Sequence, residues 1–239
     1  MRFTAETIEM LAQGVGVTML LTLVSSTLSL IIGLGVGTLR LADRPLLQRS
    51  AAIYVDVFRN IPALVLIIFI AFAVPNLVPL EIRQAIFFDN VLADWGQRLT
   101  GLSLPYYAFA AALGLTLNTS AYLAELFRAG VGTIPQGVLD SARSLGATAA
   151  VAFRRVLLPQ GVRAAFPAIS TRLIHNMKNT ALAAFVAVPE FFQATQTAIT
   201  RSFRALDFLL IASAVYLLLS FFFSAILRQI DRRLRQVQV

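Results

Sequence analysis

The stretch GVGVTMLLTLVSSTLSLIIGLGVGTL, residues 14–39, contains no charged side chain. A helix of about 20 mainly apolar residues is long enough to cross the hydrocarbon core of a bilayer. Four more segments of this kind follow, at about residues 51–74, 104–127, 164–188 and 205–227. We therefore predict an all-α polytopic membrane protein, with five transmembrane helices that form a single domain over residues 1–239.

The composition supports a membrane protein and excludes several kinds of site. Apolar residues make up 58% of the chain, against about 45–50% in an ordinary soluble domain. Cysteine is absent and His175 is the single histidine, which excludes disulfides, thiolate sites and histidine-rich metal centres. We expect no metal ligands and no catalytic residues. Because the N-terminus MRFTAETIEM is polar and acidic, we also expect no cleavable signal peptide.

The charged residues alternate between the two ends of the predicted spans. The loops after spans one and three and the C-terminal tail carry twelve basic and three acidic residues. The N-terminus and the other two loops carry five basic and seven acidic residues. The positive-inside rule places the first group in the cytoplasm, so we predict an outside N-terminus and a cytoplasmic C-terminus. The net charge of +8 then reflects topology, and we expect no nucleic-acid partner.

The outer loop, about residues 75–103, is predicted to contain an amphipathic helix at the membrane surface. Its apolar positions are Ile82, Ile86, Phe87, Val91, Leu92, Trp95 and Leu99. A sixth span is the rival interpretation. We reject it because Asp89, Asp94 and Arg98 interrupt any run of adequate length.

The longest loop on the predicted cytoplasmic side is TIPQGVLDSARSLGATAAVAFRRVLLPQ, residues 133–160. Thr133 is a candidate N-cap, and Pro135 suits the start of a helix. Gly146 is predicted to end that helix, and a second helix is expected from about Thr148 until Pro159 stops it. The apolar face of the first helix consists of Leu139, Ala142 and Leu145.

A loop of this length is usually functional rather than a simple connector. Four small residues would allow the backbone of another protein to approach closely: Ser141, Ala142, Gly146 and Ala147. Physical reasoning alone leaves two interpretations open. The loop is either a docking element for a partner or an amphipathic hairpin that rests on the inner membrane surface.

The same loop resembles the cytoplasmic loop of ABC importer permeases, whose pattern is Glu-Ala-Ala, three residues, Gly, nine residues, Ile-x-Leu-Pro. This chain has Asp140-Ser141-Ala142, then Gly146, then Val156-Leu157-Leu158-Pro159. Residues 54–69, 118–137 and 177–196 are similar to the polar amino acid branch of that family. The resemblance covers about residues 14–230 and is weakest in the 75–103 loop.

The resemblance implies the type I ABC importer permease fold in the bacterial inner (cytoplasmic) membrane. It also implies that the loop is a coupling helix that docks on a dimer of ATPase subunits, which bind ATP and Mg. Further implied partners are membrane lipid, a second permease subunit (the same chain or a paralogue) and a periplasmic amino-acid-binding protein. The implied docking residues are Asp140, Ser141, Ala142, Leu145, Gly146 and Ala147.

Span four is the most polar of the five. Its polar residues include Arg172, Asn176, Lys178, Asn179 and Thr180. Polar groups at membrane depth often mark a transport path, where a cationic side chain would attract a substrate carboxylate. Interhelical hydrogen bonding is the alternative role. Some family members have Asp at the position of Asn179. Asparagine lacks the negative charge that could pair with a cationic substrate, so it weakly disfavours a basic amino acid as substrate.

Four other features carry expectations. Pro62 is predicted to kink span two. Asp56 with Arg59, and Glu125 with Arg128, are spaced to form structural pairs on one helix face. Glu190 is a candidate for the substrate path, for contact with the binding protein, or for a solvated loop position.

Other classes of function fit less well. An ion-coupled secondary transporter is the alternative, but the chain lacks the repeated half that such folds commonly show. No GxxxxGK[ST] motif occurs, so the chain is not expected to hydrolyse ATP itself.

Overall fold

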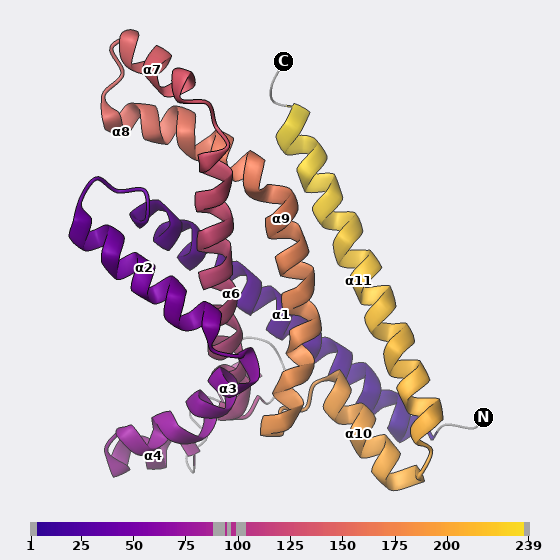
Figure 1. Cartoon of the computed structure of the whole chain (residues 1–239). Coiled ribbons are helices and arrows are strands. Elements are labelled where there is room, and N and C mark those ends of the chain that lie inside the picture. The colour runs from indigo at the N-terminus through magenta and orange to yellow at the C-terminus, as the bar shows by residue number, and fades with distance from the viewer. Residues whose placement is uncertain (1–3, 88–93, 95–96, 99–103, 237–239) are drawn as a thin grey trace. The chain divides into compact units, whose positions relative to one another are not determined.

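Figure 1 shows the computed structural model of the chain, which describes residues 4–87, 94, 97–98 and 104–236. Every regular element in these residues is helical, which agrees with the predicted all-α class. The α-helices are α1 (Ala5–Leu39), α2 (Pro45–Asn60), α3 (Ala63–Ile68), α4 (Leu80–Phe87), α6 (Tyr106–Gly132), α7 (Gln136–Ser144), α8 (Ala149–Ala152), α9 (Leu158–Asn179), α10 (Phe191–Ser202) and α11 (Ala205–Gln236). Some of these helices are extended by π turns, at Phe69–Ala73 and Phe153–Leu157. Others are extended by 3-10 helices, at Val74–Leu77 and Thr180–Val186.

Helices occupy all of the predicted spans. The first, third and fifth coincide with α1, α6 and α11, and the fourth with α9 and the 3-10 helix after it. In the described part of the chain, α1 and α11 are each long and apolar enough to cross a membrane. The segments 45–60 and 63–77 meet the same criterion together, but they are bent by 100° at the break between them, as in a broken span or a re-entrant loop. That all five segments cross the membrane stays a prediction.

The second span is not the single kinked helix that the sequence predicts. The helix ends at Asn60 and restarts at Ala63, and Pro62 between them is extended, with φ −55° and ψ 137°. Proline lacks the N–H that would continue the helix and disfavours helical geometry in the residue before it. The expected Asp56–Arg59 pair is not formed either. The Arg59 guanidinium lies 5.9 Å from the centre of the Tyr122 ring instead.

The 75–103 loop begins with a helix, in the region where the sequence predicts one. α4 starts at Leu80, and the side chain of Ile82 is half exposed. Ile86 and Phe87 also belong to α4, and the other predicted apolar positions, Val91, Leu92, Trp95 and Leu99, lie outside the described residues.

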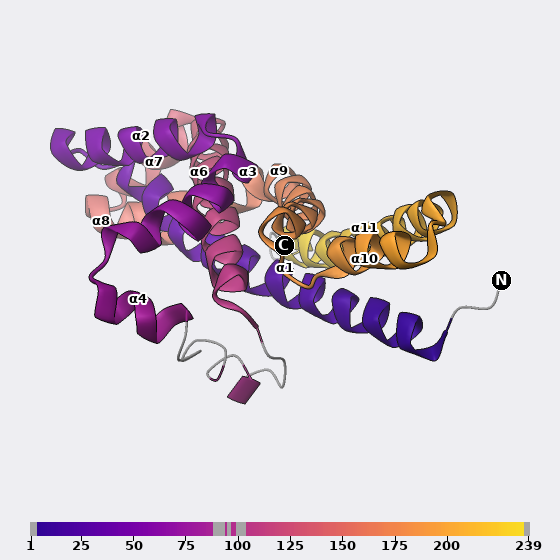
Figure 2. The ribbon, with the colours of Figure 1, turned by 90° about the horizontal axis from the view of Figure 1, so that it is seen from below.

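The chain folds into two compact units. Unit 1 comprises residues 1–28, 61–118 and 175–220. Its core joins α1, α3, α6 and the segment that precedes α10, with Val17, Ile67, Leu115 and Val188 among the buried residues. In this unit α10 folds back beside the start of α11, as Figures 1 and 2 show.

Unit 2 comprises residues 29–60, 119–174 and 221–239. Its core is a smaller cluster on α6 and α9, consisting of Leu123, Ala165, Ile169 and Leu173, with Leu227 of α11 packed against it. At Gly33 a Cβ atom would lie 2.7 Å from Cβ of Leu123, a distance that real Cβ atoms do not adopt. Glycine therefore allows α1 to approach α6 closely in this unit.

Candidate functional site

The 133–160 loop is a helix, a glycine turn and a second helix, as predicted (Figure 1). At the end of α7 the N–H of Ala147 donates to the carbonyl of Ala142, and the N–H of Gly146 donates to that of Arg143. This pair of bonds is a Schellman motif, which requires a left-handed residue, and Gly146 supplies it with φ +83°. Thr148 then caps α8 by accepting a hydrogen bond from the N–H of Val151.

Two predictions about the ends of this loop are wrong. Thr133 does not cap α7, because its hydroxyl donates to the carbonyl of Gly130 at the end of α6. Pro159 does not stop the second helix, because a π turn (Phe153–Leu157) precedes it. In that turn an N–H bonds to the carbonyl five residues earlier, as Leu158 does with Phe153. The wider turn lets the chain continue into α9 despite the missing N–H of proline.

The residues of the loop that the resemblance implicates in docking are mainly solvent-facing. Leu145 is 89% exposed, and a Cβ atom on Gly146 would have no neighbour within 4 Å. Asp140 and Ser141 are also exposed, whereas Ala142 is half-buried. The sequence predicted that Leu145 lies on one apolar face with Leu139 and Ala142. Leu145 is instead exposed, because it is the C-cap residue of α7 and lies beyond the last helical turn.

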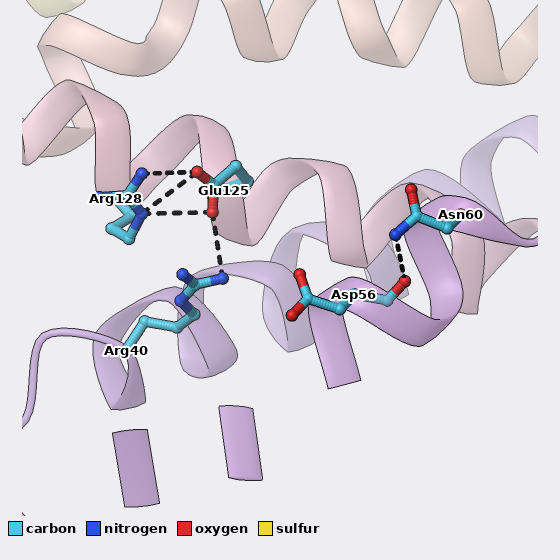
Figure 3. Close-up of polar contacts among 5 residues, drawn as sticks. All are labelled: Arg40, Asp56, Asn60, Glu125 and Arg128. Carbon is cyan, nitrogen blue, oxygen red and sulfur yellow. Dashed lines mark hydrogen bonds and ion pairs between the residues drawn. The ribbon is translucent and has the colours of Figure 1, made fainter. Parts of the chain in front are cut away.

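Glu125 anchors the end of α6 that leads into the loop. Its carboxylate accepts a hydrogen bond from Nη2 of Arg128 at 2.6 Å, which confirms the predicted pair. It also forms an ion pair with Nη1 of Arg40 at 3.2 Å (Figure 3). Both partners of this second pair are half-buried. The carboxylate therefore connects α6 to the residue that follows α1.

Asn60, the last residue of α2, makes a local hydrogen bond in the same unit. Its amide donates to the backbone carbonyl of Asp56 at 2.7 Å (Figure 3). The bond runs from the side chain to the carbonyl four residues earlier, a local pattern typical of short polar side chains in helices.

Asn176 and Thr180 of the predicted transport path lie inside unit 1. Asn176 is fully buried, and its amide donates to the hydroxyls of Ser25 at 2.8 Å and Ser26 at 3.1 Å. The buried hydroxyl of Thr180 donates to the carbonyl of Met177. The Asn176 bonds correspond to the interhelical role that the sequence left open beside transport, whereas the Thr180 bond is local to its own segment.

Arg172 stacks on an aromatic ring in unit 2. Its guanidinium carbon lies 3.8 Å from the centre of the Tyr122 ring, and Nη2 lies 3.5 Å from the hydroxyl of Thr119. A guanidinium over an aromatic face is stabilised by the ring quadrupole. The Tyr122 hydroxyl donates to the carbonyl of Arg59 and so fixes the ring.

Lys178 is exposed and lines a pocket of about 340 Å³ in unit 1. The other lining residues are Ala181, Phe192, Leu209, Ala212, Ser213 and Tyr216. The wall is therefore mainly apolar, with one cation and two hydroxyl groups. Asn179 lies beside it in the sequence and is half-buried, with its amide 3.3 Å from Nδ1 of His175.

Glu190 is not a solvated loop carboxylate, because it is fully buried. It accepts hydrogen bonds from the Thr18 hydroxyl at 3.2 Å, the Tyr216 hydroxyl at 3.0 Å and the N–H of Gln193 at 2.7 Å. The last bond makes Glu190 the N-cap of α10. One carboxylate therefore joins α1, α10 and α11 within unit 1.

Sequence reasoning missed the aromatic partners of these groups. Tyr122 and Tyr216 sit in apolar stretches and resemble ordinary span residues. Tyr122 contacts Arg172, which is 50 positions later in the sequence, and Tyr216 contacts Glu190, which is 26 positions earlier. Only the pairing of a buried tyrosine hydroxyl with a polar partner could have been anticipated.

Known proteins are similar to this chain over most of its length. The L-cystine transport system permease protein TcyL of Bacillus subtilis is 31% identical over 221 residues, 91% of this chain and 85% of that protein. The probable glutamine ABC transporter permease protein GlnP of the same organism is 31% identical and covers 81% and 78%. The octopine transport system permease protein OccM of Rhizobium radiobacter is 29% identical and covers 92% and 83%.

Solved structures share the fold. A crystal structure of an amino acid ABC transporter with histidines matches with a TM-score of 0.73, at 24% identity, over 98% of this chain and all of that one. The MetNI methionine ABC transporter in an inward-facing conformation matches with a TM-score of 0.72, at 20% identity, over 97% of this chain and 99% of that one. Residues 29–236 match the family described as "Binding-protein-dependent transport system inner membrane component". The chain thus belongs to the family of inner-membrane permease components of binding-protein-dependent transport systems.

Proposed function

We propose that the chain is the permease subunit of an ATP-binding-cassette importer for amino acids, and that its 133–160 loop receives the motion of a separate ATPase. The family match and the relatives that are amino acid permeases support the importer over an ion-coupled secondary transporter. The chain contributes no ATP-hydrolysing residues. ATP and Mg would be bound by a dimer of the partner ATPase.

One observation supports the coupling role: the C-terminal end of α7 is both ordered and exposed to solvent. α7 contains no buried residue, yet its end is fixed by a two-bond glycine cap. Leu145, at 89% exposure, is a large apolar side chain beside a glycine with open space around it. A helix end that docks on a partner needs an apolar side chain that the partner can bury, here Leu145. It also needs a backbone that the partner can approach closely, here at Gly146.

The pocket beside Lys178 is the proposed contact for the transported amino acid. The ammonium of Lys178 would attract the substrate carboxylate, and the hydroxyls of Ser213 and Tyr216 would offer hydrogen bonds. The side chains of Phe192 and Leu209 form the apolar part of the pocket wall. Among the described residues that line this pocket, one is basic and none is acidic, which favours an amino acid with an uncharged side chain.

The assembly and topology follow from the family and the charge distribution. Five spans would place the N-terminus outside and the arginine-rich end of α11 in the cytoplasm of a bacterium. A second permease subunit, identical or paralogous, would complete the path. A periplasmic amino-acid-binding protein would deliver the substrate to the outer side.

Site-directed crosslinking tests the docking surface, and the chain suits it because it has no cysteine. Leu145→Cys should form a specific crosslink to the ATPase subunit in the purified complex. Leu80→Cys on α4, exposed at 53% but predicted to lie outside, is the matched control and should form none. A crosslink from residue 80, or none from 145 in a complex that hydrolyses ATP, would contradict the proposal.

A further inference from the structure

Unit 2 contains a second pocket, of about 200 Å³, between α9 and the last part of α11. It is lined by Pro167, Ser170, Thr171, Ile174, Ser224, Leu227, Arg228 and Asp231. None of these residues belongs to the predicted docking loop or transport path. The charged residues lie on the last turns of α11, toward its arginine-rich end.

Two buried polar atoms of this pocket have no hydrogen-bond partner among the described residues: the Ser170 hydroxyl oxygen and Oδ1 of Asp231. The neighbouring Thr171 shows the usual solution for a helical hydroxyl, since it donates to the carbonyl of Pro167. Oδ2 of Asp231 is engaged with Nε of Arg235 at 3.0 Å. A buried polar group without a partner is costly, so both atoms indicate a ligand that supplies the missing bonds.

The chemistry of the wall defines that ligand. A carboxylate oxygen only accepts hydrogen bonds, so Asp231 requires a donor, whereas the exposed Arg228 guanidinium only donates and can bind an acceptor. Ser170 can do either. A group that carries a primary ammonium and an anionic oxygen group close together satisfies both residues at once.

We infer that this pocket binds a zwitterion made of a primary ammonium and an oxyanion, and that its source is the headgroup of an ethanolamine phospholipid. The ammonium would donate to Asp231 and Ser170, and the phosphate would accept from Arg228. The apolar residues Ile174 and Leu227 line the same pocket and suit the part of a lipid below its headgroup. A free amino acid has the same pair of charges and is the other possible source.

Native mass spectrometry of the full-length chain in detergent tests the inference with two lipids of identical acyl chains. Phosphatidylethanolamine should bind about tenfold better than phosphatidylcholine, because a quaternary ammonium cannot donate a hydrogen bond to Asp231. Asp231→Asn and Ser170→Ala should reduce this preference. Arg228→Gln should weaken binding of both lipids. Arg235→Gln removes the pair on the other oxygen of Asp231 and should leave the preference intact.

The thermal unfolding of each variant, measured without lipid, establishes that it is folded. Equal binding of the two lipids by the unsubstituted chain would overturn the lipid as the source of the zwitterion, and an unchanged preference in folded Asp231→Asn would overturn the site itself. In a lipid-free arm, free amino acids are added at millimolar concentration. If they raise the unfolding temperature through Asp231 while the two lipids bind equally, the zwitterion site stands and its lipid source is wrong.

Discussion

The hydroxyl of Tyr216 donates to the buried carboxylate of Glu190 at 3.0 Å, and the same tyrosine lines the pocket beside Lys178. The ring of Tyr216 also packs edge-on against Phe191, with 5.6 Å between the ring centres. Glu190 therefore fixes one wall of the proposed substrate pocket without lying in that wall. We interpret Glu190 as a positioning residue rather than a substrate ligand.

Glu190→Ala should lower the free energy of unfolding by roughly 2–4 kcal/mol, because one buried donor (Thr18) and two half-buried donors (Tyr216 and Gln193) lose their acceptor. Tyr216→Phe removes one of these bonds and should cost only about 1 kcal/mol. Unfolding of the purified chain by SDS in mixed micelles measures both. A stability of Glu190→Ala equal to that of the unsubstituted chain would contradict the proposed role.

The glycines of α1 provide a matched pair for helix packing. At Gly33 a Cβ would meet Cβ of Leu123 at 2.7 Å, whereas a Cβ at Gly35 would meet nothing within 4 Å. Gly33→Ala should therefore destabilise the fold by about 1–3 kcal/mol through overpacking. Gly35→Ala should be neutral or stabilise it by up to about 1 kcal/mol, because alanine is the better helix former. The same SDS titration compares them, and equal effects would refute the close approach of α1 to α6.

Lys178 is expected to contribute to uptake by attracting the substrate carboxylate. Lys178→Gln should reduce amino acid uptake into proteoliposomes about tenfold, which is the order expected for one lost charge-assisted hydrogen bond. Lys178→Arg keeps the charge and should retain most of the uptake. Arg201→Gln, which removes an exposed cation paired with Glu6, is the control for general loss of charge. Uptake by Lys178→Gln at the unsubstituted rate would exclude Lys178 from the path.

The sequence predicted the helices well because their signals are local. Runs of apolar residues mark α1 and α11, and Gly146 marks the end of α7 because the left-handed turn there favours glycine. The prediction failed where distant residues decide the outcome. Spacing alone favoured a pair between Asp56 and Arg59, but the ring of Tyr122 attracts the arginine instead.

The candidate site was predicted less completely than the fold. The helix, glycine turn and second helix of the 133–160 loop follow from its own residues, and docking of this loop on a partner stays a prediction. Burial of Glu190 could not be deduced, because it depends on Thr18, 172 positions earlier, and on Tyr216. Likewise, the proline at 159 indicated a helix end, but the π turn before it has no sequence signal of comparable strength.

The most direct test of the central claim is ATP hydrolysis by the complete complex in proteoliposomes, with and without loaded binding protein. Gly146→Val forces a β-branched residue into a left-handed turn and should abolish the stimulation by loaded binding protein. Gly137→Ala lies on the same short helix with open space around it and should preserve the stimulation. Loss of stimulation in Gly146→Val alone would support transmission through the loop. Equal stimulation in Gly146→Val and the unsubstituted complex would contradict it.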